Sequence, residues 1–328
     1  MKIDTDINRR ELARTLGMGA LGAGALGAGL MATTGQAAAR PAAKPAAMPV
    51  PQPPGGPWTG YGNLRRAGGV LHYATLGPDN TGLPPVVVLH KLGGWLSDWR
   101  FVAPALAEHR KVIAIDLPGH GGSRWDGEAP YIQTLGETAA LLVGLLDELD
   151  IMQVDLLGTS LGGCAAAVLA AHYPERIHRL SIISSALYGR RTLAQVKAAV
   201  DDKLKAIFDD QGNPLPTPPQ LLVDTFGMVH PEAMNEEGIL SRRAAAHWLQ
   251  PSERGVGVCD LRDALRRIEA PTLMVFGEHD KAYVKFRTFA EAALRHSRTE
   301  VVPDSGAFVI QDNPTAAAAI LKRFVEQG

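Results

Sequence analysis

The sequence predicts an α/β domain built on a mostly parallel, doubly wound sheet with helices on both faces. Two observations predict this fold class. Apolar, strand-like runs alternate with helix-like segments along most of the chain, and a G-x-S-x-G run at 158–162 joins a strand-like run directly to a helix-like one. Such alternation is typical of parallel sheets. The chain has 328 residues, 46% of them hydrophobic, which is enough for one large domain with a substantial core.

Each element has its own signal in the sequence. Alternating or continuous apolar runs predict strands at 70–75, 86–89, 112–115, 154–157, 180–183, 272–276 and 300–302. Helical spacing of apolar residues predicts helices at 99–109, 135–149, 163–173, 284–295 and 314–326. The alternation pauses from 188 to 262, where a more polar, Pro-containing stretch predicts a helical insertion that caps the site.

The N-terminus has the pattern of a bacterial twin-arginine export signal. Arg9 and Arg10 precede the weakly apolar stretch 16–32, and three alanines (37–39) form a small-residue cleavage site before Arg40. The apolar stretch is short and rich in Gly, so no stable membrane anchor is expected. We therefore expect export by the twin-arginine machinery to the periplasm or the medium. The predicted parts are a signal peptide at 1–39, a Pro/Ala-rich linker at 40–57 and the domain at 58–328.

Composition and motifs narrow the partners. The formal net charge is −1, which argues against nucleic acid as a main partner. The histidines and acidic residues lack metal-ligand spacing, and neither a phosphate loop nor a dinucleotide fingerprint occurs. We expect a small-molecule substrate or ligand, with no metal and no cofactor.

The G-x-S-x-G run carries the chemistry. Between a strand and a helix it indicates a nucleophile elbow, a sharp turn that pushes the hydroxyl of Ser160 out of the sheet. The flanking Gly158 and Gly162 allow close approach of neighbouring backbone. The N–H of Leu161, at the start of the helix, is placed to face a developing oxyanion.

With further motifs in order, the chain resembles the α/β-hydrolase family, in the subgroup with a helical cap. The resemblance runs from about residue 61 to the end, and its motifs are at 89–94, 116–121, 158–162, 173–176, 277–280 and 303–306. It implies that Ser160 is the nucleophile and Asp280 the acid of a triad, with the N–H groups of Leu92 and Leu161 as the oxyanion hole.

Two positions depart from the family pattern. Ala307 stands where the catalytic histidine is expected, and an alanine cannot take a proton from Ser160. Lys91 stands where the oxyanion loop usually has Gly. Lys91 could act as a substitute base, bind a substrate carboxylate or stabilise an oxyanion, or simply face solvent or pair with Asp280. His279 is the nearest substitute histidine in sequence.

Other residues near these motifs have open roles. His90 and His120 belong to loops that line the site in relatives, where His120 could contact the substrate and both could be structural. Trp95 and Trp99 could form a pocket wall or pack a helix against the sheet.

The hypothesis is an exported serine hydrolase-like enzyme that acts on a small ester, lactone or other carbonyl compound through Ser160, with Lys91 as an altered base or electrostatic group. One alternative is a binding protein that kept the pocket and lost turnover. Another is an engineered variant in which Ala307 replaces the histidine of an active hydrolase. In the binding protein, a lysine beside the pocket would favour acidic ligands.

Overall fold

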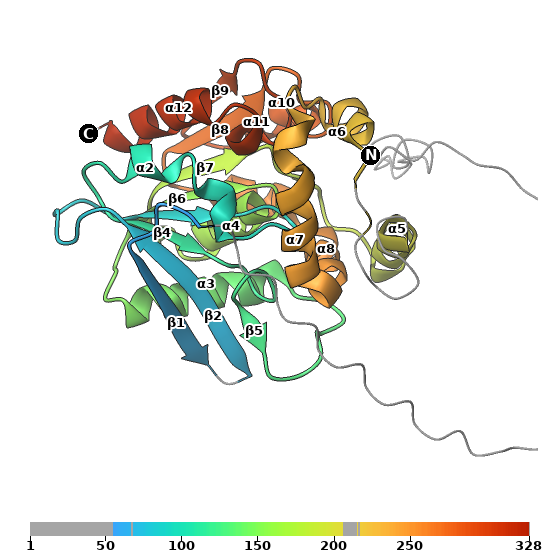
Figure 1. Ribbon diagram of the computed structural model, residues 1–328, viewed down its shortest axis with the longest axis horizontal. Helices are drawn as coiled ribbons and strands as arrows, with labels where there is room; N and C mark the ends of the chain where they lie inside the picture. The colour runs from blue at the N-terminus through green and yellow to red at the C-terminus, as the bar shows by residue number, and fades with distance from the viewer. Residues whose placement is uncertain (1–54, 67, 206–214, 216, 328) are drawn as a thin grey trace, which may run out of the picture.

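The computed structural model describes residues 55–66, 68–205, 215 and 217–327, in which helices cover both faces of a central sheet (Figure 1). The predicted export signal at 1–39 and most of the predicted linker at 40–57 lie outside these described residues. Among the described helices, none combines the length and apolar character that a membrane crossing requires.

Nine strands make up the sheet of the described chain, in the order β1-β2-β4-β3-β6-β7-β8-β9, with β5 paired to β2. The strands are β1 Gly60–Arg66, β2 Gly69–Leu76, β3 Val86–Leu89, β4 Val112–Ile115, β5 Arg124–Trp125, β6 Val154–Thr159, β7 Ile177–Ile183, β8 Thr272–Gly277 and β9 Ser297–Val302. All neighbours from β4 to β9 are parallel, whereas β2 pairs antiparallel with β1, β4 and β5. The predicted mostly parallel sheet is therefore confirmed.

Helices of two separate layers bury the two faces of the sheet. The helices are α2 Ala103–Leu106, α3 Leu135–Glu148, α4 Leu161–His172, α5 Leu193–Lys205, α6 Pro219–Phe226, α7 Asn235–Ala245, α8 Leu249–Val258, α9 Leu261–Arg267, α10 Arg287–Ala293, α11 Val309–Asp312 and α12 Pro314–Glu326. Leu142 of α3 and Leu265 of α9 belong to one apolar cluster, whereas Leu106 of α2 and Leu321 of α12 belong to the other. The prediction of helices on both faces is confirmed.

The predicted helix at 99–109 is wrong. The chain instead forms a 3-10 turn at Leu96–Trp99 and the single-turn helix α2, in which Pro104 occupies the first turn. A proline has no N–H and its ring clashes with the carbonyl four residues earlier, so a continuous helix through Pro104 would be broken there. The predicted helix at 284–295 is likewise divided, into a 3-10 turn at Val284–Phe286 and α10.

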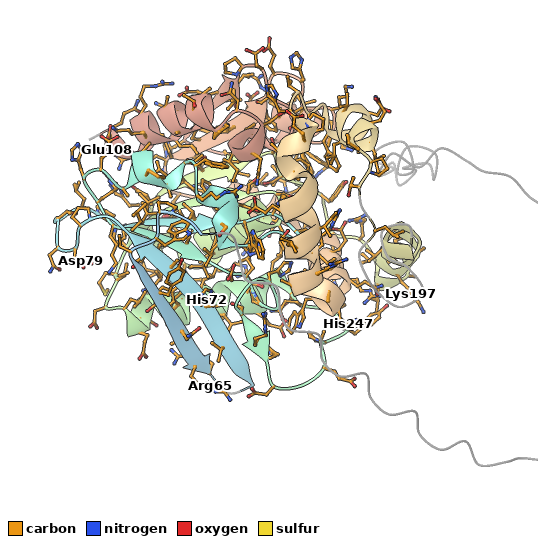
Figure 2. All side chains as sticks on the ribbon, viewed as in Figure 1. Arg65, His72, Asp79, Glu108, Lys197 and His247 are labelled. Atoms are coloured by element: carbon orange, nitrogen blue, oxygen red, sulfur yellow. The ribbon has the colours of Figure 1, made fainter. Side chains whose placement is uncertain are left out.

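The segment between β7 and β8 is helical, from α5 through α9, and approaches the sheet from one side. Figure 1 shows α5, α7 and α8 together on that side of the sheet. In Figure 2, Lys197 and His247 mark this side, opposite Asp79 and Glu108. Glu237 of α7 ties this segment to the loop after β3, because it accepts a hydrogen bond from Trp95 Nε1 (2.8 Å) and pairs with Arg100.

Candidate active site

Ser160 occupies a strained turn between β6 and α4. Its backbone has φ 51° and ψ −111°, a conformation that costs energy for a residue with a side chain. The turn is held from both sides, since Ser160 N–H donates to Ile183 O and Gly162 N–H donates to His90 O, each at 3.0 Å. A Cβ at Gly158 would collide with the backbone of Gly162, so glycine is required for this close approach. Strained, well-anchored geometry of this kind is typical of functional sites.

Two backbone N–H groups beside this turn have no hydrogen-bond partner anywhere in the described chain. One is Leu161 N–H, the first of helix α4, and the other is Leu92 N–H in the loop after β3. The first N–H groups of a helix have no acceptor within the helix and carry its positive dipole end. Both predicted oxyanion-hole donors are therefore available to an acceptor brought by a ligand.

Lys91 precedes Leu92 and forms a buried ion pair. Its Nζ lies 2.9 Å from Asp98 Oδ2, and both side chains are buried, so Lys91 lies neither in solvent nor beside Asp280. A charged ammonium has no lone pair with which to accept a proton. Lys91 does not adopt a left-handed backbone either, so the loop accommodates it in place of Gly without that strain; Gly93 carries the positive φ, at 67°. This arrangement favours an electrostatic over a basic role.

His90 and His120 are fully buried and lie side by side, with ring centroids 5.1 Å apart. Nδ1 of His90 lies 2.7 Å from the carbonyl of Lys91, while Nε2 accepts from Leu117 N–H at 2.9 Å. These bonds fix the tautomer with the proton on Nδ1, and burial lowers the pKa of His90 to about 4. His90 thus holds the oxyanion loop against the loop after β4.

His120 combines one satisfied and one unsatisfied ring nitrogen. Nδ1 lies 3.0 Å from Pro118 O, whereas Nε2 is buried without a partner in the described part of the chain. Burial lowers the pKa of His120 to about 3, so the ring is neutral. Its buried lone pair is available only to a donor that enters the protein.

Trp95 and Trp99, the two tryptophans after the oxyanion loop, are both fully buried. Trp95 donates its indole N–H to Glu237 of α7, and Trp99 packs in the apolar cluster on the α2 and α12 face of the sheet. Trp99 therefore packs a layer against the sheet, while Trp95 connects the loop after β3 to the helical segment above it.

Asp280 follows β8 and is buried without a histidine partner in the described residues. Its Oδ2 accepts from the hydroxyl of Ser184 at 2.9 Å, and its Oδ1 accepts from the N–H groups of Ala282 (2.9 Å) and Tyr283 (2.8 Å). Burial raises the pKa of Asp280 above its ordinary value, against the hydrogen bonds that stabilise the carboxylate. The carboxylate thus holds the turn that carries Tyr283.

Tyr283 contacts Ser160, although the sequence analysis did not identify it as a site residue. Its hydroxyl lies 3.5 Å from Ser160 Oγ, and either oxygen can donate. No motif marks Tyr283, and the only available signal is its position three residues after Asp280, within the turn that this acid holds.

Ala307 lies in a fully buried position beneath the helical segment. Its N–H donates to the carbonyl of Phe226 at 2.8 Å, at the end of α6. The ring of Phe226 packs against Phe308 and lies 6.4 Å from the ring of Tyr283. The position where the family places its histidine is therefore held by the backbone of an aromatic residue and precedes another, Phe308.

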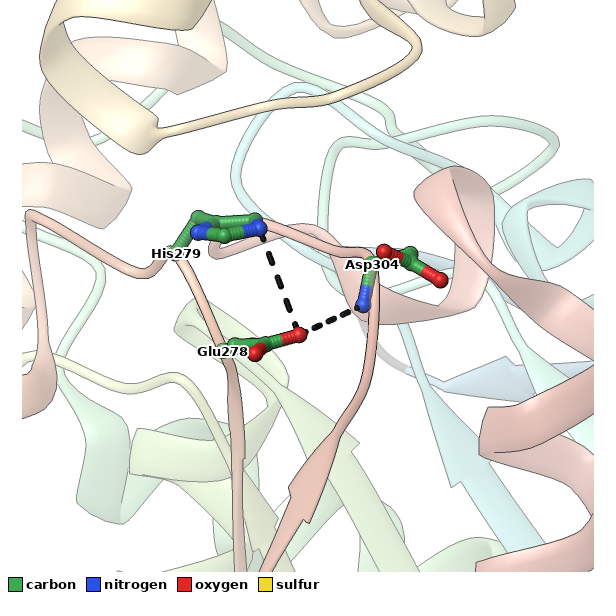
Figure 3. Close-up of side chains that lie close together, drawn as sticks. All are labelled: Glu278, His279 and Asp304. Atoms are coloured by element: carbon green, nitrogen blue, oxygen red, sulfur yellow. Dashed lines mark hydrogen bonds and ion pairs between the residues drawn. The ribbon is translucent and has the colours of Figure 1, made fainter.

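Exposed Glu278, His279 and Asp304 form the one group in the described chain that could offer three metal-ligand atoms, and sequence spacing did not indicate it (Figure 3). Glu278 Oε2 accepts from the backbone N–H of Asp304 at 3.1 Å and lies 4.0 Å from His279 Nε2. These mutual contacts account for the placement of Glu278 and His279 without an ion. His279 is exposed and pairs with Glu278, and no hydrogen bond joins it to Ser160 in the described residues.

Comparisons with known proteins agree with this fold. A family model described as the alpha/beta hydrolase fold matches residues 84–226. The chain is 32% identical over 212 residues to 2-hydroxymuconate semialdehyde hydrolase from Pseudomonas sp. (strain CF600). This match covers 60% of this chain and 70% of that protein. It is 30% identical over 261 residues to the pimeloyl-[acyl-carrier protein] methyl ester esterase of Aeromonas hydrophila. This match covers 74% of this chain and 95% of that protein.

A third relative matches over a shorter stretch. The chain is 42% identical over 122 residues to the dihydrolipoyllysine-residue acetyltransferase component of the acetoin cleaving system from Pseudomonas putida, but spans only 32% of that protein's length and 37% of its own. Among solved structures, a hydrolase from Pseudomonas aeruginosa superposes with a TM-score of 0.63 at 25% identity, covering 82% of this chain and 99% of that one.

Proposed function

Because the chain belongs to the α/β-hydrolase family, we propose that it is an enzyme that hydrolyses a small ester, lactone or related carbonyl compound through Ser160. The observation that carries this proposal is the pairing of a hydroxyl on a strained elbow with two unpartnered N–H groups, of Leu161 and Leu92. Ser160 Oγ attacks the carbonyl carbon, and the two N–H groups stabilise the negative charge that develops on the carbonyl oxygen. Removing one such donor typically costs 10²–10³-fold in rate.

Lys91 contributes to this site as an electrostatic group. Its ammonium is buried one residue before Leu92, and Asp98 fixes it there. A fixed positive charge next to the oxyanion loop favours the negatively charged intermediate, and such charges act strongly where water is excluded. His120 and Trp95 are placed by their loops near the same end of the sheet, where they would shape the substrate pocket.

The test is hydrolysis of p-nitrophenyl acetate by residues 40–328, with Ser160→Ala as the comparison. Turnover that falls to the background rate in Ser160→Ala is expected, because no other nucleophile is placed on the elbow. Turnover that survives in Ser160→Ala would show that the chemistry lies elsewhere in the chain.

A binding protein is the second candidate, and one observation favours it: Ala307 offers no base to Ser160. Such a protein would hold a carbonyl or carboxylate group on the N–H groups of Leu92 and Leu161 without converting it. Stoichiometric binding of a short carboxylate, measured by calorimetry alongside an absence of Ser160-dependent turnover, would support this candidate over the enzyme.

We also propose that the protein is exported through the twin-arginine machinery. The support is the sequence of the first 39 residues, with paired Arg9 and Arg10 and a cleavage site before Arg40. Replacing both arginines by lysine should retain the full-length chain inside a bacterial host, whereas Arg14→Lys should not. N-terminal sequencing of the exported protein should begin at Arg40.

A further inference from the structure

The hydroxyl of Tyr283 stands beside Ser160 in a site that has no histidine at the family position. The two oxygens are 3.5 Å apart, a distance that a substrate-bound state can shorten, since catalytic hydrogen bonds are often long in free enzymes. The phenol ring reaches this position from the turn after β8, where Asp280 accepts the Tyr283 N–H at 2.8 Å. A buried carboxylate therefore holds the backbone turn from which the phenol projects.

The surroundings of the phenol are mostly apolar. Phe226 lies on one side with its ring centroid 6.4 Å away, and Phe226 in turn packs on Phe308. The titratable groups that act on the phenol are Glu253 of α8, Tyr188 before α5, and Asp280 on its own turn. None of these three groups is a cation, and each of them raises the pKa of the phenol.

A neutral phenol is the form that this environment maintains. Burial raises the pKa of Tyr283 well above its ordinary value, against the contact with Ser160. A protonated phenol carries both an O–H donor and acceptor lone pairs, so it can receive one proton while it releases another. A histidine base, by comparison, must hold the proton and carry a charge between the two transfers.

We propose that Tyr283 is a catalytic residue that relays the serine proton directly to the leaving group, an assignment that rests on the proposed hydrolysis. In acylation, Ser160 Oγ bonds to the carbonyl carbon and its proton passes to the Tyr283 oxygen. The Tyr283 proton passes to the leaving-group oxygen as the bond from that oxygen to the carbonyl carbon breaks. The alcohol leaves, and Tyr283 is again a neutral phenol.

Deacylation runs the same relay in reverse. A water molecule bonds to the acyl carbon and gives one proton to the Tyr283 oxygen, and the Tyr283 proton passes to Ser160 Oγ as the acyl bond breaks. The products are the carboxylic acid and free Ser160, with every proton accounted for. The leaving-group oxygen is two bonds from Ser160 Oγ in the tetrahedral intermediate, so one hydroxyl beside Oγ reaches both oxygens.

The test compares Tyr283→Phe with the unchanged protein on two acetate esters that share one acyl group. Ethyl acetate has a leaving group that needs a proton, whereas p-nitrophenolate leaves readily without one. We expect kcat/KM, which reports acylation and not the deacylation that the two esters share, to fall by about 10²-fold or more on ethyl acetate and at least tenfold less on p-nitrophenyl acetate. Phenylalanine keeps the ring that packs near Phe226. Tyr173→Phe, which removes a hydroxyl at the far end of α4, should leave both rates unchanged.

The ratio of the rate losses on the two esters tests the relay, because any unfolded fraction of a variant lowers both rates by the same factor. Equal losses on the two esters, or no loss on either, would overturn the relay and leave the proposed hydrolysis intact. An unchanged protein with no Ser160-dependent turnover on either ester would overturn both. A bell-shaped dependence of kcat/KM with an acidic limb near the pH of an ordinary imidazole would also contradict a neutral phenol relay.

Discussion

Ala307 stands at the position where the family has its catalytic histidine. The residue is fully buried, its N–H is held by Phe226 O, and the rings of Phe226 and Phe308 pack nearby. The hydroxyl of Tyr283 lies 3.5 Å from Ser160 Oγ. In the described residues a phenol hydroxyl, and not an imidazole, therefore contacts Ser160 Oγ.

Ala307→His is expected to lower the melting temperature and to leave the rate of p-nitrophenyl acetate hydrolysis at or below its starting level. Forcing a larger side chain into a packed interior typically costs about 1–3 kcal/mol. Ala307→Asn, which adds a smaller polar group without a base, is the matched control. A rate increase of tenfold or more in Ala307→His alone would show instead that the histidine pocket is intact.

Lys91 and Asp98 are expected to depend on each other. Lys91→Met leaves a buried carboxylate without its partner, which typically costs about 3–5 kcal/mol, whereas adding Asp98→Asn removes the stranded charge. The double variant should therefore be more stable to urea than Lys91→Met alone. Additive losses in this double-mutant cycle would mean that the two charges do not stabilise each other.

The sequence predicted some residues of the site and not others, because the residues are positioned in different ways. Ser160 and Asp280 are marked by motifs, because a strand-to-helix turn leaves a local pattern. Tyr283 and Asp98 meet their partners across 123 and 7 residues of chain, through turns whose geometry appears only after folding. Periodicity and motif spacing contain no information on such contacts.

At the scale of elements, buried strands and amphipathic helices were predictable because each has a strong period. Strand 112–115 and helix 314–326 occur with the predicted bounds. Strand β1 was missed because only Leu64 of its seven residues is buried, so it lacks a clear apolar pattern. The start of helix α3, by contrast, was predictable. Thr134 and Glu137 form a capping box that starts the helix where its apolar pattern begins.

Asp312, at the end of α11, is the carboxylate that fastens the helical segment to the loop after β9. It accepts from the N–H groups of Val229 (3.0 Å), His230 (2.6 Å) and Gly306 (2.7 Å). Asp312→Asn replaces one acceptor oxygen by an amide donor and removes the charge. Hydrogen bonds to charged groups contribute about 1.5–3 kcal/mol each, so at least one such loss is expected.

Hydrogen exchange gives the readout for Asp312→Asn. The amides of Val229, His230 and Gly306 should exchange faster, while those of helix α3, on a different part of the sheet, should change only with global stability. Asp224→Asn, at an exposed position of α6, is the control. Uniform acceleration across all amides would mean that Asp312 acts on the whole fold rather than on this junction.

At the scale of the whole molecule, buried, neutral imidazoles connect the loop after β3 with the loop after β4. Burial lowers the pKa of His90 to about 4 and that of His120 to about 3, from an ordinary value of 6.5. Between these values the unfolded chain binds protons that the folded protein does not, so the free energy of unfolding decreases as the pH falls from about 6.5 to 4. Each ring contributes on the order of 3 kcal/mol to that decrease.

Buried carboxylates act in the opposite direction. Burial raises the pKa of Asp98, Asp155 and Asp280, so over their titration range the folded protein binds protons more readily than the unfolded chain. Acid therefore favours the folded state through these three groups. The total pH dependence mixes both effects, and only a difference between variants isolates the histidines.

His120→Gln is expected to flatten the fall in stability between pH 6.5 and 4, because the variant removes one proton-binding group from the unfolded chain. Urea unfolding at pH 7.5, 5.5 and 4.5 measures it, with the exposed His172→Gln as the control that should follow the unchanged protein. Since Nε2 of His120 has no partner among the described residues, the substitution leaves no donor stranded there. Parallel stability curves for the two variants would mean that His120 takes up a proton in the folded state as readily as an exposed imidazole, contrary to its burial.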